Sequence, residues 1–315
     1  MTVVIDLAGG QSGGAGRFRA QYLEYASDHG SSGLSVIGLD HFVTPRWLLR
    51  REAVAFGSEK VIAANNVSFA LAGKSRWTLL RNANHFLSRE EWQEFAQRLG
   101  RGFATQTQVV RAAARRSDVL VVPSSSMADR VATVLPELAD RIVVRLHPLS
   151  VPPKPPVPPS VGPTILCPIV NSAYKHLVNH LELLQQALGS SDARVVCTIR
   201  PDEASPTLRT DDRFSLVGLL SRERLRDEYD AATAVYFPTS IESFGYPLAE
   251  ARAAGMPVLA QETDHNREIA GPALFGYRSG QASSLGAAVS DALSASLTPD
   301  PVPFDPATYF DWLLH

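Results

Sequence analysis

The chain has 315 residues, of which 45% are hydrophobic and 20% charged, and its formal net charge is −2. This apolar content excludes a disordered protein, and at about 100–200 residues per domain the length allows two globular cores. No run reaches the roughly 18 apolar residues of a membrane span. The first residues, MTVVIDLAGG, lack the basic region and cleavage site of a signal peptide. We therefore expect a cytoplasmic protein.

The two halves of the chain differ in charge. Residues 1–150 contain 18 Lys and Arg against 13 Asp and Glu (net +5), whereas residues 151–315 contain 12 against 19 (net −7). This asymmetry favours an anionic partner for the first half, although scattered solvated arginines explain it almost as well. The stretch RWLLRREAVAF (46–56) combines arginines with large apolar side chains, as interfacial helices do, so we hypothesise a peripheral membrane contact. No aromatic and basic motif predicts nucleic-acid binding.

Short runs rich in Val, Ile and Leu alternate with longer amphipathic stretches, a pattern typical of β-α-β units on a buried parallel sheet. In the first half the predicted strands are 3–8, 34–39, 60–64, 76–82, 118–123 and 141–146. In the second half they are 163–169, 193–199, 214–218, 234–238 and 257–260.

A proline-rich segment separates these halves. Six prolines in residues 151–160 block helix and favour a stiff, extended chain. We predict a first Rossmann-like domain at 1–150, a linker at 151–162 and a second Rossmann-like domain at 163–315. The fold class is α/β, with two doubly wound domains that face each other across a cleft. Ligands should bind beyond the carboxyl ends of the strands.

The first predicted strand is followed by the glycine-rich segment GGQSGGAGRFRAQYLEY. Glycine amides at a helix N-terminus suit a phosphate. A G-x-G-x-x-G fingerprint fails because Arg19 stands where the third glycine would fall after Gly14 and Gly16, and a P-loop lysine is missing. A hydrolase elbow, G-x-S-x-G around Ser12, fails because only eleven residues precede the serine and leave no room for an oxyanion donor.

Metal and disulfide chemistry have little support. The two cysteines, Cys167 and Cys197, lie in predicted strands, and we expect both to be buried free thiols. His176 and His180 are four residues apart without the H-E-x-x-H pattern, and no Asp-x-Asp pair occurs. We expect no metal cofactor.

Two carboxylates distinguish residues 234–260, which predict a strand, a loop, a helix and a second strand. Pro247 suits the first helical position, Gly255 the C-terminal cap, and Glu250 the first turn. A helix dipole explains an acid at Glu250, but it does not explain Glu242 in the loop.

The amides of Phe244 and Gly245 would lie at the N-terminus of this predicted helix. Such amides can hold a diphosphate, while Glu250 accepts hydrogen bonds from a ribose diol. Glu242 would then reach toward the group beyond the phosphates.

With seven residues between Glu242 and Glu250, this region resembles the E-x7-E motif of retaining glycosyltransferases of family 4, which have the GT-B fold. Further segments resemble that family across most of the chain: GGAGRFRAQYLEYASDHG, DVLVVPSSSMADRV, SAYKHLVNHLELLQQAL and LVGLLSRERLRDEYDAATAVYFPTSIESFG. The resemblance implies transfer of a sugar from a nucleoside diphosphate sugar to a hydroxyl acceptor, without a metal.

The resemblance also assigns roles by position. It gives Lys175 as the cation that balances charge on the leaving nucleotide and Glu242 as a contact to the donor sugar, and these are the expected catalytic residues. Glu250 would hold the ribose, and Leu219 would contact the base through its backbone. The positions assigned to donor binding are Gly13, Gly14, Lys175, Leu219, Glu242, Phe244, Gly245 and Glu250.

In the first half, LLRNANHF (79–86) resembles the segment that faces the acceptor, which makes Asn82 and His85 acceptor candidates. One feature departs from the family pattern. An arginine often precedes the lysine, but CPIVNSAYK has Asn171 and Ser172 instead. Either Arg200 replaces that arginine or the phosphate charge is less neutralised.

Two other functions remain compatible with these residues. A GT-B-like sugar-nucleotide epimerase would share the nucleotide site and need a single substrate. A non-catalytic nucleotide-sugar binding protein would keep Glu250 and the glycine loops. Lys175 and Glu242 favour chemistry over binding alone, but fold does not decide between these functions.

Overall fold

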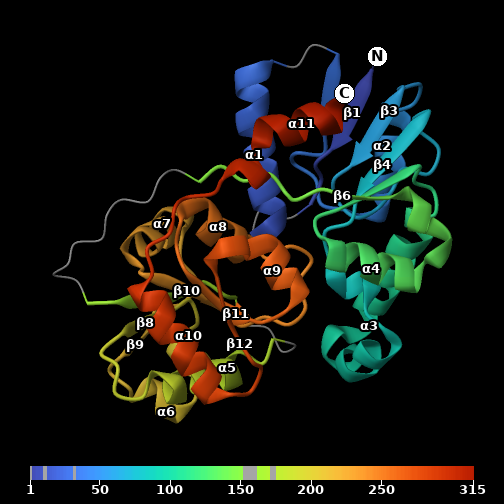
Figure 1. The fold of residues 1–315 in the computed structure, drawn as a ribbon. Coiled ribbons are helices and arrows are strands. Elements are labelled where there is room, and N and C mark those ends of the chain that lie inside the picture. Colours follow the sequence, from blue (N-terminus) through green and yellow to red (C-terminus); the bar gives the residue numbers. More distant parts are fainter. Residues whose placement is uncertain (1, 10–12, 31–32, 152–161, 171–174) are drawn as a thin grey trace. The chain divides into compact units, whose positions relative to one another are not determined.

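A computed structural model describes residues 2–9, 13–30, 33–151, 162–170 and 175–315 (Figure 1). Three features of the sequence lie outside this part: residues 10–12 of the G-x-S-x-G pattern, most of the proline-rich linker, and the Asn171–Ser172 position.

The chain divides into two compact units. Unit 1 comprises Met1–Ser150, Glu242–Phe244 and Phe304–His315, and unit 2 comprises Val151–Ile241 and Gly245–Pro303. The first break falls where the proline-rich segment begins. The two later segments of unit 1 were not expected, since the sequence analysis assigned residues 163–315 to the second domain.

Unit 1 contains a six-stranded, all-parallel sheet in the order β2-β1-β3-β4-β5-β6. Its strands are β1 (Val3–Asp6), β2 (Leu34–Ile37), β3 (Lys60–Ala63), β4 (Ser75–Leu79), β5 (Val119–Val122) and β6 (Ile142–Val144). Its helices are α1 (Gly13–His29), α2 (Pro45–Val54), α3 (Arg89–Ala114), α4 (Ser125–Val134) and α11 (Pro306–Leu314). Each strand lies within a predicted run or one residue outside it. Every residue of β1 and β3 is buried, as expected for central parallel strands.

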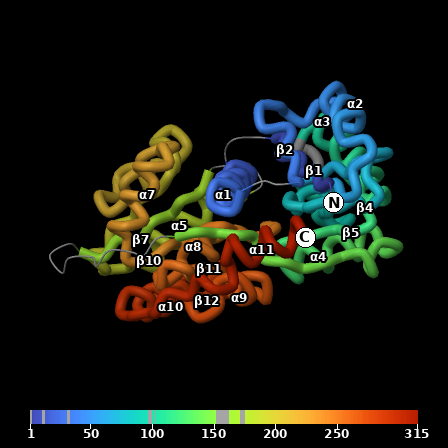
Figure 2. The backbone as a smooth tube through the Cα atoms, turned by 90° about the horizontal axis from the view of Figure 1, so that it is seen from above, coloured from blue at the N-terminus to red at the C-terminus, as the bar shows by residue number. Residues whose placement is uncertain are grey.

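The C-terminal helix α11 packs against α1 within unit 1 (Figures 1 and 2). The Phe310 ring lies 5.4 Å from that of Tyr22, and the Tyr25 hydroxyl donates to Asp311 Oδ1. The apolar side chains of α11 therefore find their buried surface in unit 1, which explains why the final residues leave the second domain.

Unit 2 contains a second six-stranded parallel sheet, in the order β12-β11-β10-β7-β8-β9. Its strands are β7 (Thr164–Cys167), β8 (Arg194–Cys197), β9 (Phe214–Leu216), β10 (Ala234–Phe237), β11 (Val258–Gln261) and β12 (Leu274–Tyr277). Its helices are α5 (Leu177–Leu188), α6 (Pro206–Arg209), α7 (Arg222–Ala231), α8 (Tyr246–Ala254), α9 (Asp264–Ala270) and α10 (Ala282–Ser294). The sequence prediction missed β12, because LFGY is short, contains a glycine and forms an edge strand.

The predicted free thiols are confirmed. Cys167 and Cys197 face each other in register on β7 and β8, and both are buried and free. The Cys197 hydrogen bond and burial raise the pKa of the Cys167 thiol well above its usual value.

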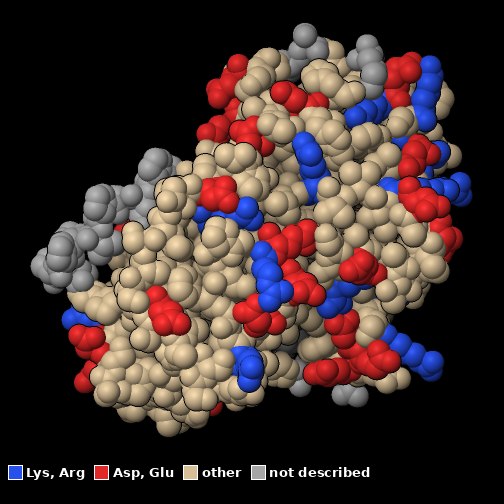
Figure 3. All heavy atoms as spheres, viewed as in Figure 1, with Lys and Arg blue, Asp and Glu red and all other residues tan. Residues whose placement is uncertain are grey.

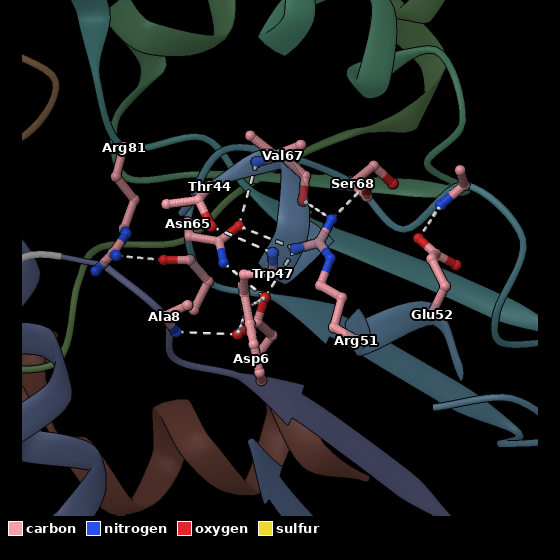
Figure 4. A network of polar contacts seen from close by, with 12 residues as sticks. Asp6, Ala8, Thr44, Trp47, Arg51, Glu52, Asn65, Val67, Ser68 and Arg81 are labelled. Atoms are coloured by element: carbon pink, nitrogen blue, oxygen red, sulfur yellow. Dashed lines mark hydrogen bonds and ion pairs between the residues drawn. The ribbon is translucent and has the colours of Figure 1, made fainter. Parts of the chain in front are cut away.

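A buried ion pair joins the end of β1 to α2 (Figure 4). Asp6 and Arg51 are 0% and 1% exposed, and Arg51 Nη1 donates to Asp6 Oδ2 at 2.8 Å. The same oxygen accepts from Asn65 Nδ2 at 2.8 Å, and the indole of Trp47 donates to Asp6 Oδ1 at 3.2 Å. Arg51 Nη2 donates to the carbonyls of residues 67 and 68. The network thus connects β1, α2 and the loop after β3.

We expect Arg51→Met to destabilise unit 1 by about 3–5 kcal/mol, because the Asp6 carboxylate would stay buried without its counterion. All four tryptophans belong to unit 1, so their fluorescence in a urea titration reports on this unit. The matched control is Arg115→Met, which breaks a pair with Glu137 whose partners are 50% and 48% exposed, and should cost less than about 1 kcal/mol. Equal losses in the two variants would contradict a structural role for the buried pair.

Candidate functional site

The strand order of unit 2 defines one candidate site. All strands are parallel, so their carboxyl ends lie along one edge of the sheet. The chain begins the sheet at β7, adds β8 and β9 on one side, and then adds β10, β11 and β12 on the other. The order therefore reverses between β7 and β10, and ligands of doubly wound sheets bind at such a switch point.

Lys175 follows β7 on the β7 side of this switch point. It lies in a turn, is half-buried, and is followed by His176, whose φ of 47° is left-handed, and then by α5. This position suits the predicted role of a cation near a phosphate. His176 and His180 form no part of a metal cluster, since no group of three His, Cys, Asp or Glu among residues the structure describes is placed to hold an ion.

On the other side of the switch point, α8 begins after β10. Gly245 is its N-cap with φ of 81°, a left-handed conformation that favours glycine, and a Cβ there would approach Leu248 Cδ1 to 3.0 Å. The helix starts one residue earlier than predicted, so Pro247 occupies the second position and Glu250 lies beyond the first turn. The predicted position of Glu250 in the first turn is therefore wrong. The helix dipole stabilises an acid at Glu250 less than expected, because that effect fades after the first turn.

Glu250 has a partner that the sequence did not suggest. The Tyr229 hydroxyl on α7 donates to Glu250 Oε2 at 2.8 Å, and both side chains are half-buried. Tyr229 thus fixes the orientation of the carboxylate. It is the one aromatic residue of α7, RERLRDEYDA, a helix otherwise dominated by charge, and this is the signal that could have identified it.

Thr239, two residues after β10, is a second feature that the sequence analysis missed. Its side-chain hydroxyl is buried and has no hydrogen-bond partner in the described part of the chain. A buried hydroxyl without a partner carries a free-energy cost, so a ligand that bonded to it at the switch point would gain from the contact.

The loops after β8 and β9 lie farther along the same edge. Gly218 has φ of 70° and donates its amide to the Ile199 carbonyl, and the following Leu219 is 80% exposed. Arg200, the candidate substitute for the absent family arginine, is 64% exposed and pairs with Asp202 and Glu203. Two carboxylates already balance its charge, which argues against Arg200 as the main phosphate cation.

In unit 1, Gly13 and Gly14 form the first residues of α1, at the carboxyl end of β1. Gly13 has φ of 60°, and a Cβ there would meet no atom within 4 Å. This sheet also has a switch point, since β2 and β3 lie on either side of β1. The two glycines therefore open a 17-residue helix at an edge where ligands bind.

The segment Glu242–Phe244 packs within unit 1. Ser243 Oγ donates to the Arg81 carbonyl at 2.7 Å, and Ser124 Oγ donates to the Ser243 carbonyl at 2.9 Å. Phe244 is 2% exposed, and its ring lies 5.2 Å from that of His147 in an edge-to-face contact. Phe244 is thus a buried anchor, and it holds the half-buried Glu242 in the conformation set by its neighbours.

Asn82 and His85 lie close together in unit 1 after β4. Asn82 caps a short 3-10 helix, Ala83–Phe86, and its amide nitrogen lies 3.4 Å from His85 Nε2. His85 Nδ1 lies 3.1 Å from Thr107 Oγ1, and the imidazole is stacked on Phe103. Because only 1% of His85 is exposed, the structure places its ring in the interior as a support for Asn82. Asn82 itself is half-buried.

Burial, assisted by the charge of Arg111, lowers the pKa of His85 to about 4. A folded-state pKa below the usual value of 6.5 means that the unfolded chain binds the proton more tightly. His85 should therefore contribute no pH dependence above pH 6.5, and should destabilise the fold as the pH falls from 6.5 to 4.

We expect the unfolding free energy of the wild type to fall by about 3 kcal/mol relative to that of His85→Gln between pH 6.5 and pH 4, because glutamine takes up no proton. Urea titrations of both proteins, followed by tryptophan fluorescence, measure the difference. Parallel stability curves over this range would show that the imidazole is accessible to protons in the folded state.

The sequence and the fold were both compared with those of known proteins. Residues 203–300 match the family model described as Glycosyl transferases group 1. The matched region contains Leu219, Tyr229, Glu242 and Glu250, whereas Lys175 precedes it. No curated protein of similar sequence was found.

Solved structures resemble the whole chain. Sucrose-phosphate synthase from Thermosynechococcus elongatus is 14% identical with a TM-score of 0.63, covering 100% of this chain and 95% of the other. WaaG, a glycosyltransferase involved in lipopolysaccharide biosynthesis, is 15% identical with a TM-score of 0.62, covering 98% and 95%. UDP-GlcNAc 2-epimerase from Methanocaldococcus jannaschii is 11% identical with a TM-score of 0.56, covering 99% of both chains. At such low identity these matches establish the fold, which is GT-B as predicted.

Proposed function

We propose that this protein is a retaining glycosyltransferase, similar to family 4, that moves a sugar from a nucleoside diphosphate sugar to a hydroxyl acceptor without a metal. The observation that carries the proposal is the switch point of unit 2, where Lys175 follows β7 and the N-terminus of α8 follows β10. The glycosyl transferase match over residues 203–300 supports the same reaction class.

Each part of the donor has a proposed partner. The amides at the start of α8, from Gly245 onward, and the ammonium of Lys175 would hold the diphosphate. Glu250, oriented by the Tyr229 hydroxyl, would accept hydrogen bonds from the ribose diol. The backbone at Leu219 would contact the base.

Residues of unit 1 would complete the reaction. Gly13 and Gly14 would approach the diphosphate through their backbone, and Glu242 would bind a hydroxyl of the donor sugar. Phe244 would hold that loop through its buried ring. Asn82 would contact the acceptor, and His85 would support Asn82 from the interior rather than touch the acceptor.

In the proposed reaction, the bond between the sugar and the diphosphate breaks while the acceptor oxygen attacks from the same face. Because the acceptor attacks on the face from which the diphosphate leaves, configuration is retained, and the departing phosphate takes the acceptor proton. Lys175 and the α8 amides stabilise the charge that develops on the phosphate. Such preorganised groups supply much of the rate enhancement of many enzymes, and they make a metal ion unnecessary.

The acceptor class is a saccharide, a lipid-linked molecule or a small metabolite, and we propose no nucleic-acid partner. We also propose a cytoplasmic protein that touches the inner face of the membrane. Among the described residues, no helix is both long enough and apolar enough to cross a bilayer.

The second candidate function is a sugar-nucleotide epimerase, which the structural similarity to UDP-GlcNAc 2-epimerase favours. An epimerase needs no acceptor. Release of free nucleoside diphosphate that depends on an added acceptor would distinguish a transferase from it. A non-catalytic nucleotide-sugar binding protein would bind the donor and release nothing under either condition.

A nucleoside diphosphate should stabilise the protein without added divalent metal, because the proposed phosphate site consists of amides and Lys175. At 100 times the dissociation constant, binding adds about 2.7 kcal/mol to stability, which a thermal-shift experiment detects. The screen should cover the common bases, each with and without EDTA. Loss of the shift in EDTA would contradict the metal-independent site.

The two carboxylates should respond differently to substitution. A hydrogen bond to a charged group is worth about 1.5–3 kcal/mol, so Glu250→Ala should weaken nucleoside diphosphate binding by roughly 10- to 150-fold. Tyr229→Phe removes the hydroxyl that orients Glu250 and should weaken binding in the same direction by a smaller factor. Glu242→Gln should leave binding of the bare nucleotide nearly intact and lower turnover of the complete donor.

Calorimetry with nucleoside diphosphate and a product assay on the same variants would separate these roles. Circular dichroism establishes that each variant is folded. If Glu250→Ala and Glu242→Gln weaken bare nucleotide equally, or if neither affects binding or turnover, the donor site has been assigned to the wrong residues.

A further inference from the structure

Unit 1 presents several large apolar side chains to solvent around α2. Phe42, Leu49, Phe56 and Leu71 are 71%, 76%, 80% and 78% exposed. They come from three segments of the chain: the loop before α2, the helix with the residues directly after it, and the loop after β3. We call these four residues, with Arg46 and Arg50, the α2 surface.

Helix geometry places part of this set on one side of α2. Leu49 and Ala53 are four residues apart, so they share one face of α2, and both are exposed; Phe56 lies two residues after the end of the helix and is exposed as well. The opposite side of α2 is fixed inside the protein, because Trp47 and Arg51 are buried in the Asp6 network (Figure 4). The rotation of the helix is therefore set, and its outward face cannot turn inward to hide Leu49.

Glu52 joins Leu71 to the same side of the helix. Its carboxylate accepts hydrogen bonds from three consecutive backbone amides, those of residues 70, 71 and 72, at 2.7, 3.0 and 2.8 Å. These bonds attach the loop to α2, so the exposed Leu71 side chain lies beside the helix. Because these amides occupy the Glu52 carboxylate, its negative charge is partly compensated inside the protein.

The α2 surface itself carries two positive charges, those of Arg46 and Arg50, whereas Asp40, two residues before Phe42 in the chain, is an exposed carboxylate. Arg46 and Arg50 are exposed and form no ion pair with any residue that the structure describes. The nearby Lys74 pairs with Glu59, and Glu52 is occupied by amides. Elsewhere on the molecule, the face in Figure 3 has cationic and anionic side chains interspersed. The α2 surface instead combines protruding apolar side chains with two unbalanced guanidinium groups.

We propose that the α2 surface docks on an anionic lipid bilayer, with Leu49, Phe56 and Leu71 inserted at the headgroup boundary and Arg46 and Arg50 on lipid phosphates. This combination of apolar and cationic side chains is the one that interfacial helices use. A protein partner would need acidic groups opposite both arginines, whereas an anionic bilayer supplies negative charge at every position. The proposal does not depend on sugar transfer.

Sedimentation with vesicles tests the proposal on the full chain. Wild-type protein should pellet with vesicles of phosphatidylcholine and phosphatidylserine, and should remain in solution with phosphatidylcholine alone. The triple variant Leu49→Ser, Phe56→Ser, Leu71→Ser should lose binding by at least on the order of tenfold. Arg46→Gln with Arg50→Gln should lose roughly 25-fold, since each arginine near an anionic surface contributes about fivefold, and salt should weaken the wild type in the same way.

Two matched controls accompany these variants. Arg115→Gln with Arg116→Gln removes the same charge from another exposed part of unit 1, and Val302→Ser removes an apolar side chain that is 79% exposed in unit 2. Both should bind vesicles like the wild type. Because every substituted residue is exposed, all variants should unfold close to the wild-type urea concentration, and the Arg115 and Arg116 variant should lose less than about 1 kcal/mol with its surface ion pair to Glu137.

Equal sedimentation with neutral and anionic vesicles, or binding unchanged in the triple variant, would overturn the proposal. So would a dimer in analytical ultracentrifugation that the triple variant abolishes, because the surface would then be an interface between two copies. The nucleotide-dependent thermal shift should be the same in the triple variant and the wild type. A failure of membrane binding is thereby separated from a failure of the proposed glycosyltransferase function.

Discussion

The buried pair between Asp6 and Arg51 is the constraint on which most of unit 1 depends. Asp6 ends β1, so its carboxylate fixes where the first strand gives way to the glycine-rich segment, and its contact with Arg51 sets the rotation of α2. The bond from Asn65 adds the loop after β3 on the other side of the same switch point. A charge pair this deep costs much to desolvate, and a hydrophobic pair would often be as stable. Its geometry explains its use, because one carboxylate with directional partners orients three segments at the edge where ligands bind.

Unit 2 also has a switch point at the carboxyl edge of its sheet, but backbone conformation rather than a buried ion pair shapes it. Its switch point is flanked by left-handed backbone at His176 and Gly245, and each of these residues starts a helix directly after a strand loop. The groups available to a ligand there are backbone amides, one lysine and one oriented carboxylate. In the proposed function these groups would bind the diphosphate of the donor and balance its charge without a metal. The site therefore depends on the direction of strands and helices more than on any unusual side chain.

Much of this architecture could be predicted from sequence, because buried parallel strands are short, apolar and separated by amphipathic helices. Eleven strand positions follow from that pattern alone, and β12 does not, since a glycine and an edge position weaken its signal. The carboxylate spacing located α8, but it could not reveal Tyr229, whose relation to Glu250 exists only after α7 and α8 fold together. For His85 the sequence identified the residue but not its environment. The sequence identified a histidine beside Asn82, whereas its burial against Phe103 and Thr107 depends on contacts about 20 residues away.

Glu242 and Glu250 belong to different units, and different residues position each carboxylate. Glu250 is held by a hydroxyl of its own unit, so its affinity for a ribose diol should be a property of unit 2 alone. Glu242 is positioned by the packing of its neighbours Ser243 and Phe244 in unit 1, through Arg81, Ser124 and the aromatic cluster at His147. Substitutions in that cluster should therefore disturb the proposed contact to the donor sugar while leaving nucleotide affinity intact. The seven-residue spacing thus brings the two proposed roles into one short segment, although the packing that supports each carboxylate comes from a separate unit.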